Sequence, residues 1–273
     1  EQVPMQQMSW PACAGLCLFL SATFASSEPA PADFSREEAL AYSQQAIGRT
    51  VSGVTLTAGD GEPRALESFR GRPLVVSLIF TSCHHICPST TQYLNEVVKK
   101  ARGALGEDSF EVITVGFDTA NDSPGRMAEF ARSNGVTDPR WQFLAADEAA
   151  MDALASQLGF IYTPSSRGFD HLIQASVIDA DGRVYRQVYG IRFPTPQLIE
   201  PLKQLVFGEP QEQSSLSYLG NRIRLFCTVY DPATDSYRID ISVFIGTIVG
   251  VIVSILFGYV LLKEWRKSIR ADQ

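Results

Sequence analysis

Strand-like apolar runs alternate with helical segments through the middle of this 273-residue chain. Buried strands are expected at 74–80, 110–117 and 173–179, a short strand at 141–144, and a hairpin partner at 184–189; helices are expected at 36–47, 89–102, 124–133, 147–158 and 196–207. Strands that alternate with helices pack as a sheet with helices on both faces. The pattern therefore predicts an α/β fold with a mixed sheet.

Two cysteines lie where the first of these strands meets its helix, in the stretch Thr81-Ser82-Cys83-His84-His85-Ile86-Cys87-Pro88. The last strands are expected to form an antiparallel hairpin followed by a helix, which is a thioredoxin-like arrangement. In that arrangement the redox centre lies at this strand–helix junction. The sequence therefore predicts that the pair Cys83 and Cys87 carries the chemistry.

The first reading of this pair is a metal site. Thiolates favour Cu(I), zinc and iron–sulfur clusters, but two cysteines are too few for a four-thiolate site. Two thiolates and one imidazole suit copper. His84 and His85 lie between the cysteines and are poorly placed to close a ring with both sulfurs, whereas His171 precedes a neighbouring strand. The predicted copper ligands, as Cu(I) or Cu(II), are therefore Cys83, Cys87 and His171.

The second reading of the pair is thiol–disulfide exchange. On a helix, residues four apart share a face with Cα atoms about 6 Å apart, which is within the range for a disulfide. A helix N-terminus also lowers a thiol pKa and so favours thiolate. A static disulfide or two inert core thiols are the alternatives without chemistry. For His171 the alternative is a capping or core histidine. We expect His84 and His85 to form a solvated loop, and Cys227 to be a packed residue or, as an alternative, a partner thiol or extra ligand.

Charge and cysteine content exclude two classes of protein. The net charge of −7 argues against non-specific nucleic-acid binding. Five cysteines are too few for a disulfide-stabilised scaffold, and Cys13 and Cys17 lie in an apolar N-terminal run.

The ends of the chain suggest export and a membrane anchor. Residues 241–262 are uncharged, long enough to span a bilayer, and followed by four basic residues, which predicts a transmembrane helix with a cytoplasmic C-terminus. The predicted organisation is a signal-like segment at 1–25, a linker at 26–34, a thioredoxin-like domain at 35–208, a linker at 209–220, a small hairpin at 221–240, the span at 241–262 and a tail at 263–273. The domain would then be periplasmic and the protein a single-pass protein of the inner membrane.

With these residues in hand, the chain resembles the Sco/SenC/PrrC family of membrane-anchored, thioredoxin-like copper proteins over roughly residues 36–207. The cysteine stretch is similar to the family's T-x-C-x-x-x-C-P motif. Residues 118–124, Asp118-Thr119-Ala120-Asn121-Asp122-Ser123-Pro124, resemble its D-x-x-x-D stretch. His171, ahead of Val177-Ile178-Asp179-Ala180-Asp181-Gly182, is similar to its distal histidine before an I-D-x-D-G hairpin.

The resemblance implies copper binding by Cys83, Cys87 and His171. It also implies delivery of copper to, or reduction of the cysteines of, the CuA site in the copper-bearing subunit of cytochrome c oxidase. Other periplasmic copper chaperones or thioredoxin-like reductants are implied as further partners. Asp118 and Asp122 would shape an acidic surface that faces the partner, or support the metal ligands.

Two departures from the family pattern leave alternatives open. His84 stands where the family usually has Pro, and His85 follows it, so the redox behaviour of the pair cannot be transferred. The anchor is C-terminal and is preceded by Phe226-Cys227-Thr228-Val229-Tyr230-Asp231-Pro232, as in some bacterial relatives. The alternatives to a copper metallochaperone are a thiol–disulfide oxidoreductase or redox sensor, and an accessory subunit bound stably to a respiratory complex.

Overall fold

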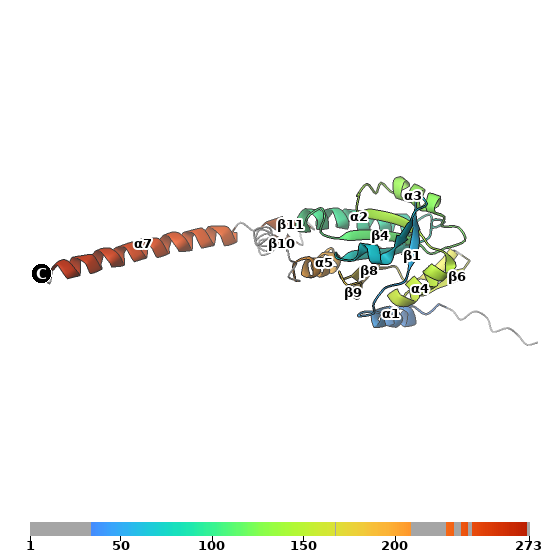
Figure 1. Ribbon diagram of the computed structural model, residues 1–273, viewed down its shortest axis with the longest axis horizontal. Coiled ribbons are helices and arrows are strands. Elements are labelled where there is room, and N and C mark those ends of the chain that lie inside the picture. The colour runs from blue at the N-terminus through green and yellow to red at the C-terminus, as the bar shows by residue number, and fades with distance from the viewer. Residues whose placement is uncertain (1–33, 167, 209–227, 232–235, 240–241, 272–273) are drawn as a thin grey trace, which may run out of the picture. The chain divides into compact units, whose positions relative to one another are not determined.

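The computed structural model describes residues 34–166, 168–208, 228–231, 236–239 and 242–271. Residues 34–208 form an α/β unit (Figure 1) with these elements: α1 (Arg36–Gln45), β1 (Thr55–Ala58), β2 (Pro63–Ala65), the 3₁₀ helix η1 (Leu66–Phe69), β3 (Leu74–Ile79), α2 (Ile86–Leu105), β4 (Glu111–Gly116), α3 (Pro124–Ser133), β5 (Trp141–Ala145), α4 (Glu148–Leu158), β6 (Tyr162–Ser165), β7 (Gly168–His171), β8 (Gln174–Ile178), β9 (Val184–Tyr189) and α5 (Pro196–Gly208).

The sheet of this unit is mixed, as predicted. Its strand order is β2-β1-β5-β4-β3-β8-β9. The central strands β3, β4 and β5 are parallel, whereas β1 and β8 run antiparallel to their neighbours in the centre and β9 runs antiparallel to β8. The loops that follow β3, β4 and β5 therefore meet at one end of the sheet, and the loops that precede them meet at the other.

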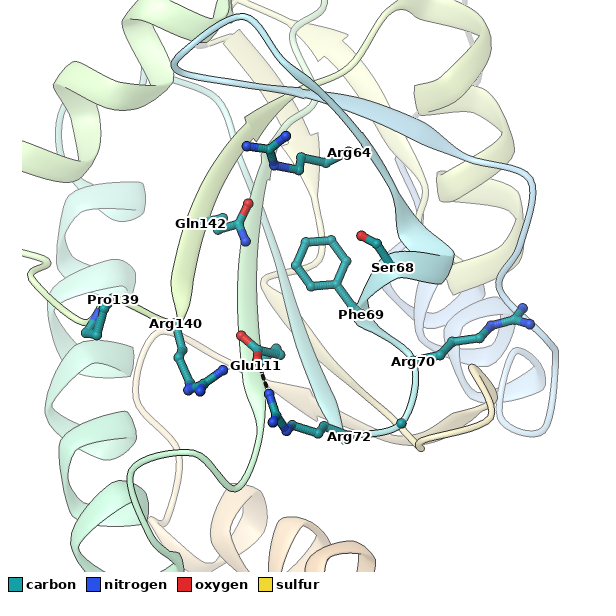
Figure 2. Close-up of a pocket in the computed structure, with 10 residues that line it drawn as sticks. Arg64, Ser68, Phe69, Arg70, Arg72, Glu111, Pro139, Arg140 and Gln142 are labelled. Carbon is teal, nitrogen blue, oxygen red and sulfur yellow. Dashed lines mark hydrogen bonds and ion pairs between the residues drawn. The ribbon is translucent and has the colours of Figure 1, made fainter.

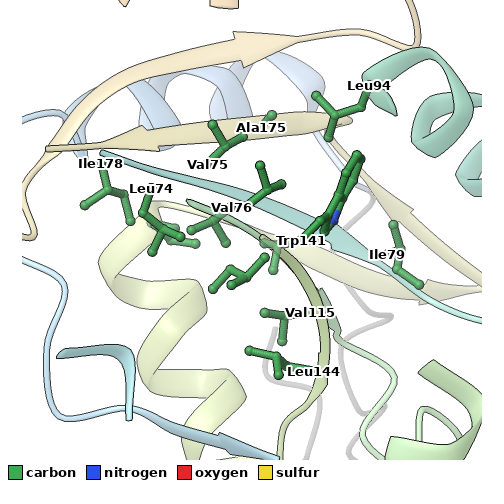
Figure 3. Packing of buried hydrophobic residues seen from close by; sticks show 14 of the residues in the cluster. Leu74, Val75, Val76, Ile79, Leu94, Val115, Trp141, Leu144, Ala175 and Ile178 are labelled. Carbon is green, nitrogen blue, oxygen red and sulfur yellow. The ribbon is translucent and has the colours of Figure 1, made fainter. Parts of the chain in front are cut away.

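Helices cover both faces of the sheet (Figure 1). The registers place Val75, Val112 and Trp141 on one face, where α2 and α3 pack. The intervening residues point to the opposite face, where the carbonyl of Leu158 at the end of α4 accepts from the Gln187 amide at 2.9 Å. Because both faces are buried, all six residues of β3 are buried, and its neighbours pack with it into one apolar core (Figure 3).

Side chains cap the first turns of α1 and α4. The Ser35 hydroxyl accepts from the Glu38 amide at α1, and the Asp147 carboxylate accepts from the Ala150 amide at α4. Thr195 precedes α5 but does not cap it with its side chain. Its carbonyl accepts from the amides of the first turn, while its buried hydroxyl has no hydrogen-bond partner within the described part of the chain.

Two elements near the cysteines differ from the expected pattern. Helix α2 begins at Ile86, three residues before the predicted start, so that Cys87 lies in its first turn and Cys83 precedes it. Residues 162–165 and 168–171, where no strand is predicted, pair as the antiparallel hairpin β6–β7, in which Tyr162 pairs with His171. Both strands are only partly buried, so they show no alternation of apolar and polar residues.

The C-terminal region contains β10 (Thr228–Asp231) and β11 (Ser236–Ile239), which pair as the predicted small hairpin, and the helix α7 (Ser242–Ala271). Helix α7 covers the residues predicted to span a membrane. Its described apolar side chains are exposed, for example Ile245 and Phe257. Within the described residues, however, no helix has the length and hydropathy needed to cross a membrane. The structure therefore does not support the transmembrane prediction.

Several predictions fall outside the described residues. They include the signal-like segment at 1–25, the linker at 209–220 and Cys227. The boundaries of the predicted domains stay predictions.

Candidate metal and redox site

The predicted site residues gather at the end of the sheet where β3, β4 and β5 finish. Cys83 follows β3, and Asp118 and Asp122 follow β4. Strand β8 runs antiparallel to β3, so its first residue lies at this same end, and His171 precedes it by three positions. The topology thus brings together two segments that are more than eighty residues apart in the sequence.

The sulfur of Cys83 lies at the start of α2 and takes the place of a helix cap. The Cys83 amide donates to the Phe80 carbonyl at 3.2 Å, which turns the chain after β3. The Cys83 Sγ then accepts from the Cys87 backbone amide at 3.3 Å. A hydrogen bond from the Cys87 thiol, together with this contact and the amides of His85 and Ile86, lowers the pKa of Cys83 to about 5, although burial opposes the shift. Cys83 is therefore a thiolate at neutral pH.

Cys87 is the protonated partner of this thiolate. Its side chain is buried, and its thiol donates to Cys83, which raises the pKa of Cys87 well above its usual range. Burial, the negative charge of Cys83 and that of Asp122 raise it further. The pair therefore consists of one partly exposed thiolate and one buried thiol, both free of a disulfide.

The imidazole of His171 presents one nitrogen for coordination. Its Nδ1–H donates to the Leu172 carbonyl at 2.8 Å, which leaves Nε2 with a lone pair. Burial lowers the pKa of His171, while the charge of Cys83 opposes the shift. The ring packs edge-on against three aromatic rings, with centroid separations of 6.2 Å to Phe80, 5.1 Å to Phe117 and 5.6 Å to Phe160. These contacts hold a neutral imidazole in a largely apolar setting.

Asp122 supports the loop that carries Cys83. Its carboxylate is buried and accepts from the Thr81 amide at 2.8 Å, the Thr81 hydroxyl at 2.6 Å and the Asp118 amide at 3.0 Å. Burial raises the pKa of Asp122. Asp122 is thus enclosed by its hydrogen bonds and does not contribute to an acidic surface, whereas Asp118 is partly exposed. The residue that caps α3 is Ser123.

His84 and His85 are both exposed, and they lie between the cysteines on the turn into α2. The structure thus agrees with the expectation of a solvated loop.

The donor types at this end of the sheet fit copper: one thiolate, one thiol and one neutral imidazole with a free nitrogen. Their positions do not close around an ion, because no group of three or more His, Cys, Asp or Glu side chains within the described ranges is placed to hold a metal. Coordination by all three residues would therefore require a shift of the cysteine turn or of the hairpin that carries His171.

Comparison with known proteins identifies the family. The family model described as SCO1/SenC matches residues 44–206, which is more than half of the chain. The chain belongs to the SCO1/SenC family. The match covers every element from the end of α1 to α5, and therefore includes both cysteines and His171.

Individual relatives agree with this assignment. The chain is 28% identical to a SCO1 protein homolog of Bacillus subtilis over 151 residues, which are 53% of this chain and 76% of that protein. A putative electron transfer protein of Aquifex aeolicus is 25% identical, with a TM-score of 0.55 over 62% of this chain and 99% of that one. A SCO1/SenC family lipoprotein of Bacillus anthracis is 20% identical, with a TM-score of 0.53 over 58% and 95%.

The SCO1/SenC fold is thioredoxin-like, which confirms the predicted fold of the α/β unit. Proteins of this family take part in copper binding and in the assembly of cytochrome c oxidase.

Proposed function

We propose that this protein is a copper metallochaperone that matures the CuA site, or a related copper site, of a respiratory cytochrome c oxidase. The observation that carries the proposal is that the Cys83 thiolate and a neutral His171 lie at the same end of the sheet. Membership of the SCO1/SenC family supports it. Copper is here the cargo that the protein receives and passes on.

Each proposed ligand has a distinct part in holding copper. Cys83 is ionised at neutral pH and can bind the ion first. Cys87 must lose its proton before it can coordinate, so coordination by Cys87 is the step that releases a proton. His171 offers Nε2 from a ring whose other nitrogen is already bonded to the Leu172 carbonyl. The proposed ligand set is therefore Cys83, Cys87 and His171.

Copper stoichiometry and affinity of the full chain test this proposal. We expect Cys83→Ser, Cys87→Ser and His171→Ala each to weaken Cu(I) binding by more than ten-fold in a competition titration with a chromophoric chelator. The matched control is His84→Ala, which removes an exposed imidazole beside the site and is expected to leave the affinity within two-fold of the unmodified protein. Unchanged copper affinity in His171→Ala would refute the ligand set.

Thiol–disulfide exchange is the second candidate function, and the difference in acidity between the two cysteines favours it. The Cys83 thiolate would attack a substrate disulfide and form a mixed disulfide, releasing one substrate thiolate. Cys87 would then lose its proton, attack Cys83 Sγ and release the second substrate sulfur as a thiolate, with Cys83–Cys87 oxidised. Two electrons pass from the protein to the substrate, and an external dithiol must restore the reduced pair.

One variant distinguishes the two candidate functions. Exchange needs only the two sulfurs, so His171→Ala would keep the reduction of a model disulfide while losing copper. Loss of both activities in a folded His171→Ala protein would contradict a pure exchange function.

The proposed recipient is the copper-bearing subunit of the oxidase. The predicted exported location of the domain stays a prediction from the sequence, and protease accessibility in intact spheroplasts would test it.

A further inference from the structure

A depression of about 650 Å³ lies at the end of the sheet opposite the cysteines (Figure 2). Four arginines, one glutamate and several polar groups line it: Arg64, Ser68, Phe69, Arg70, Gly71, Arg72, Glu111, Pro139, Arg140 and Gln142. None of these residues belongs to the copper or redox chemistry proposed above. The depression is therefore a separate feature of the molecule.

The direction of the parallel strands creates this cluster. Arg72 precedes β3, Glu111 is the first residue of β4, and Arg140 precedes β5, so all three lie at the amino ends of the strands. The register places Glu111 and Gln142 on the same face of the sheet. Arg64 arrives from β2 at the other side of the depression, with Phe69 of η1 between (Figure 2).

Four arginines line the depression and three carboxylates pair with three of them, so one positive charge is in excess. A single Glu111 Oε1 accepts from Arg72 Nη1 at 3.1 Å and from Arg140 Nη1 at 2.7 Å. At the rim, Asp108 pairs with Arg140, and Asp60 pairs with Arg64 at 3.2 Å. A guanidinium has five N–H donors, and these ion pairs leave donors of all three arginines available.

These arginines are accessible from solvent. Their side chains are 34% exposed at Arg64, 46% at Arg72 and 29% at Arg140. The carboxylates of Asp60 and Asp108 are exposed, so their ion pairs are weak and carboxylates from another molecule can compete for these guanidinium groups. Sites for small molecules are mostly apolar and enclose the ligand, whereas this one is polar and lies at the surface. An extended chain with several carboxylates fits it better.

We propose that this arginine depression is a docking surface for an acidic segment of a partner polypeptide. Carboxylates spaced along the segment would pair with Arg64 at one side and with Arg72 and Arg140 at the other. Ser68 and Gln142 supply hydrogen-bonding groups between them, and Phe69 supplies an apolar floor. The six residues of β3 lie between this surface and the cysteines, and at about 3.3 Å per residue they span about 20 Å. A docked partner therefore leaves the cysteine end free.

Fluorescence polarisation with the full chain and a labelled hexaglutamate peptide, capped at both ends, tests the proposal. We expect saturable binding at about 50 mM salt that weakens at least ten-fold in the double variant Arg64→Gln/Arg72→Gln. The variant Arg72→Lys keeps the charge but loses the planar pair of donors, and we expect an intermediate affinity. The matched control is Arg132→Gln, which removes an exposed arginine, also in an ion pair, from α3 on the other face of the sheet. It should bind like the unmodified protein.

Several results would overturn the proposal. They are an absence of saturable binding, equal weakening by Arg132→Gln, and unchanged affinity in the double variant with its fold verified by thermal unfolding. Displacement of the peptide by inorganic phosphate at equal charge concentration would also overturn it, because it would indicate a simple anion site. Copper stoichiometry of the double variant should stay unchanged, so failure here is distinct from failure of the copper proposal.

Discussion

Two identical side chains four residues apart behave differently because their surroundings differ. Cys83 is partly exposed and accepts hydrogen bonds, while Cys87 is buried and donates one. Proximity to the same helix start would lower both pKa values if it acted alone. The hydrogen bond between the sulfurs instead assigns the proton to Cys87, so nucleophilic reactivity is expected at Cys83 alone.

The pH dependence of alkylation tests this assignment. The folded pKa of Cys83 is depressed to about 5, so the thiolate persists above that pH and is protonated below it. We expect the rate of iodoacetamide modification at Cys83, followed by peptide mass spectrometry, to reach half of its maximum near pH 5. In Cys87→Ala the midpoint should move towards the ordinary value of about 8.5, because the strongest hydrogen bond to the thiolate is lost. An unchanged midpoint in that variant would contradict the proposed cause.

Proton release on copper loading follows from the same asymmetry. At pH 7 Cys83 is already ionised, His171 is neutral, and only Cys87 has a proton to lose. We expect about one proton to be released for each Cu(I) bound. Calorimetry in buffers with different ionisation enthalpies measures this number. A value near two would mean that both cysteines are protonated before loading, and a value near zero that Cys87 does not coordinate.

At the scale of secondary-structure elements, the loops after β3 and β4 are fastened to each other by Asp122. The close approach of Asp122 to the end of β4 requires a residue without a side chain at Gly116. A Cβ there would lie 2.5 Å from the Asp122 Cβ and 2.8 Å from the Met127 Sδ. Gly116 therefore allows the carboxylate to reach the Thr81 amide.

The variant Gly116→Ala should accordingly destabilise the fold by about 1–3 kcal/mol, as overpacked cores do. The control Gly103→Ala adds a Cβ with nothing within 4 Å on the exposed side of α2, and should stabilise by about 0.5–1 kcal/mol through helix propensity. Urea unfolding measures both changes. Equal stability of Gly116→Ala and the unmodified protein would show that the loop after β4 accommodates the added methyl group without loss of stability.

The hairpin β6–β7 sets the position of His171 through Gly168. This glycine has φ of +107°, and a Cβ on it would lie 2.8 Å from the Phe80 ring. Gly168→Ala should therefore displace the strand that carries His171 and weaken Cu(I) affinity several-fold in the chelator titration. Gly125→Ala, at an open position on α3, is the control. Retained copper affinity in a folded Gly168→Ala protein would argue against His171 as a ligand.

The elements with strong local signals could be predicted from sequence. Helices α3 and α4 begin and end close to their predicted residues because Ser123, Asp147 and Asn134 act through local hydrogen bonds. The early start of α2 could not be predicted, since its cap is a sulfur and no capping rule includes one. The hairpin β6–β7 was not predicted because its residues are neither clearly buried nor clearly exposed.

The predicted site residues Cys83, Cys87 and His171 do lie at one end of the sheet, because strand order alone places them there. Their protonation states could not be predicted, since these depend on single hydrogen bonds and on burial. The arginine depression was also missed. Its members come from four separate segments, and only the strand register brings them together.

At the scale of the whole α/β unit, the two ends of the sheet have different chemistry. Sulfur, imidazole and buried carboxylate lie at one end, and accessible guanidinium groups lie at the other. The strands between them are almost fully buried, and they separate the two ends.

Copper loading and peptide docking should therefore be independent. We expect the hexaglutamate peptide to bind copper-loaded and copper-free protein with dissociation constants within two-fold of each other. Coupling of more than ten-fold would indicate a conformational link through the sheet. Fluorescence polarisation in the presence of excess chelator or of Cu(I) decides between these results.

The common direction of β3, β4 and β5 also bears on how such a protein can change over generations. Substitutions in the loops that precede these strands alter the guanidinium surface without touching the sulfur chemistry, and substitutions in the loops that follow them do the reverse. A lineage could therefore exchange the proposed binding partner for another while keeping the proposed metal site intact. Diversity among relatives should then concentrate at residues 64–72 and 139–142, while the cysteine turn varies little.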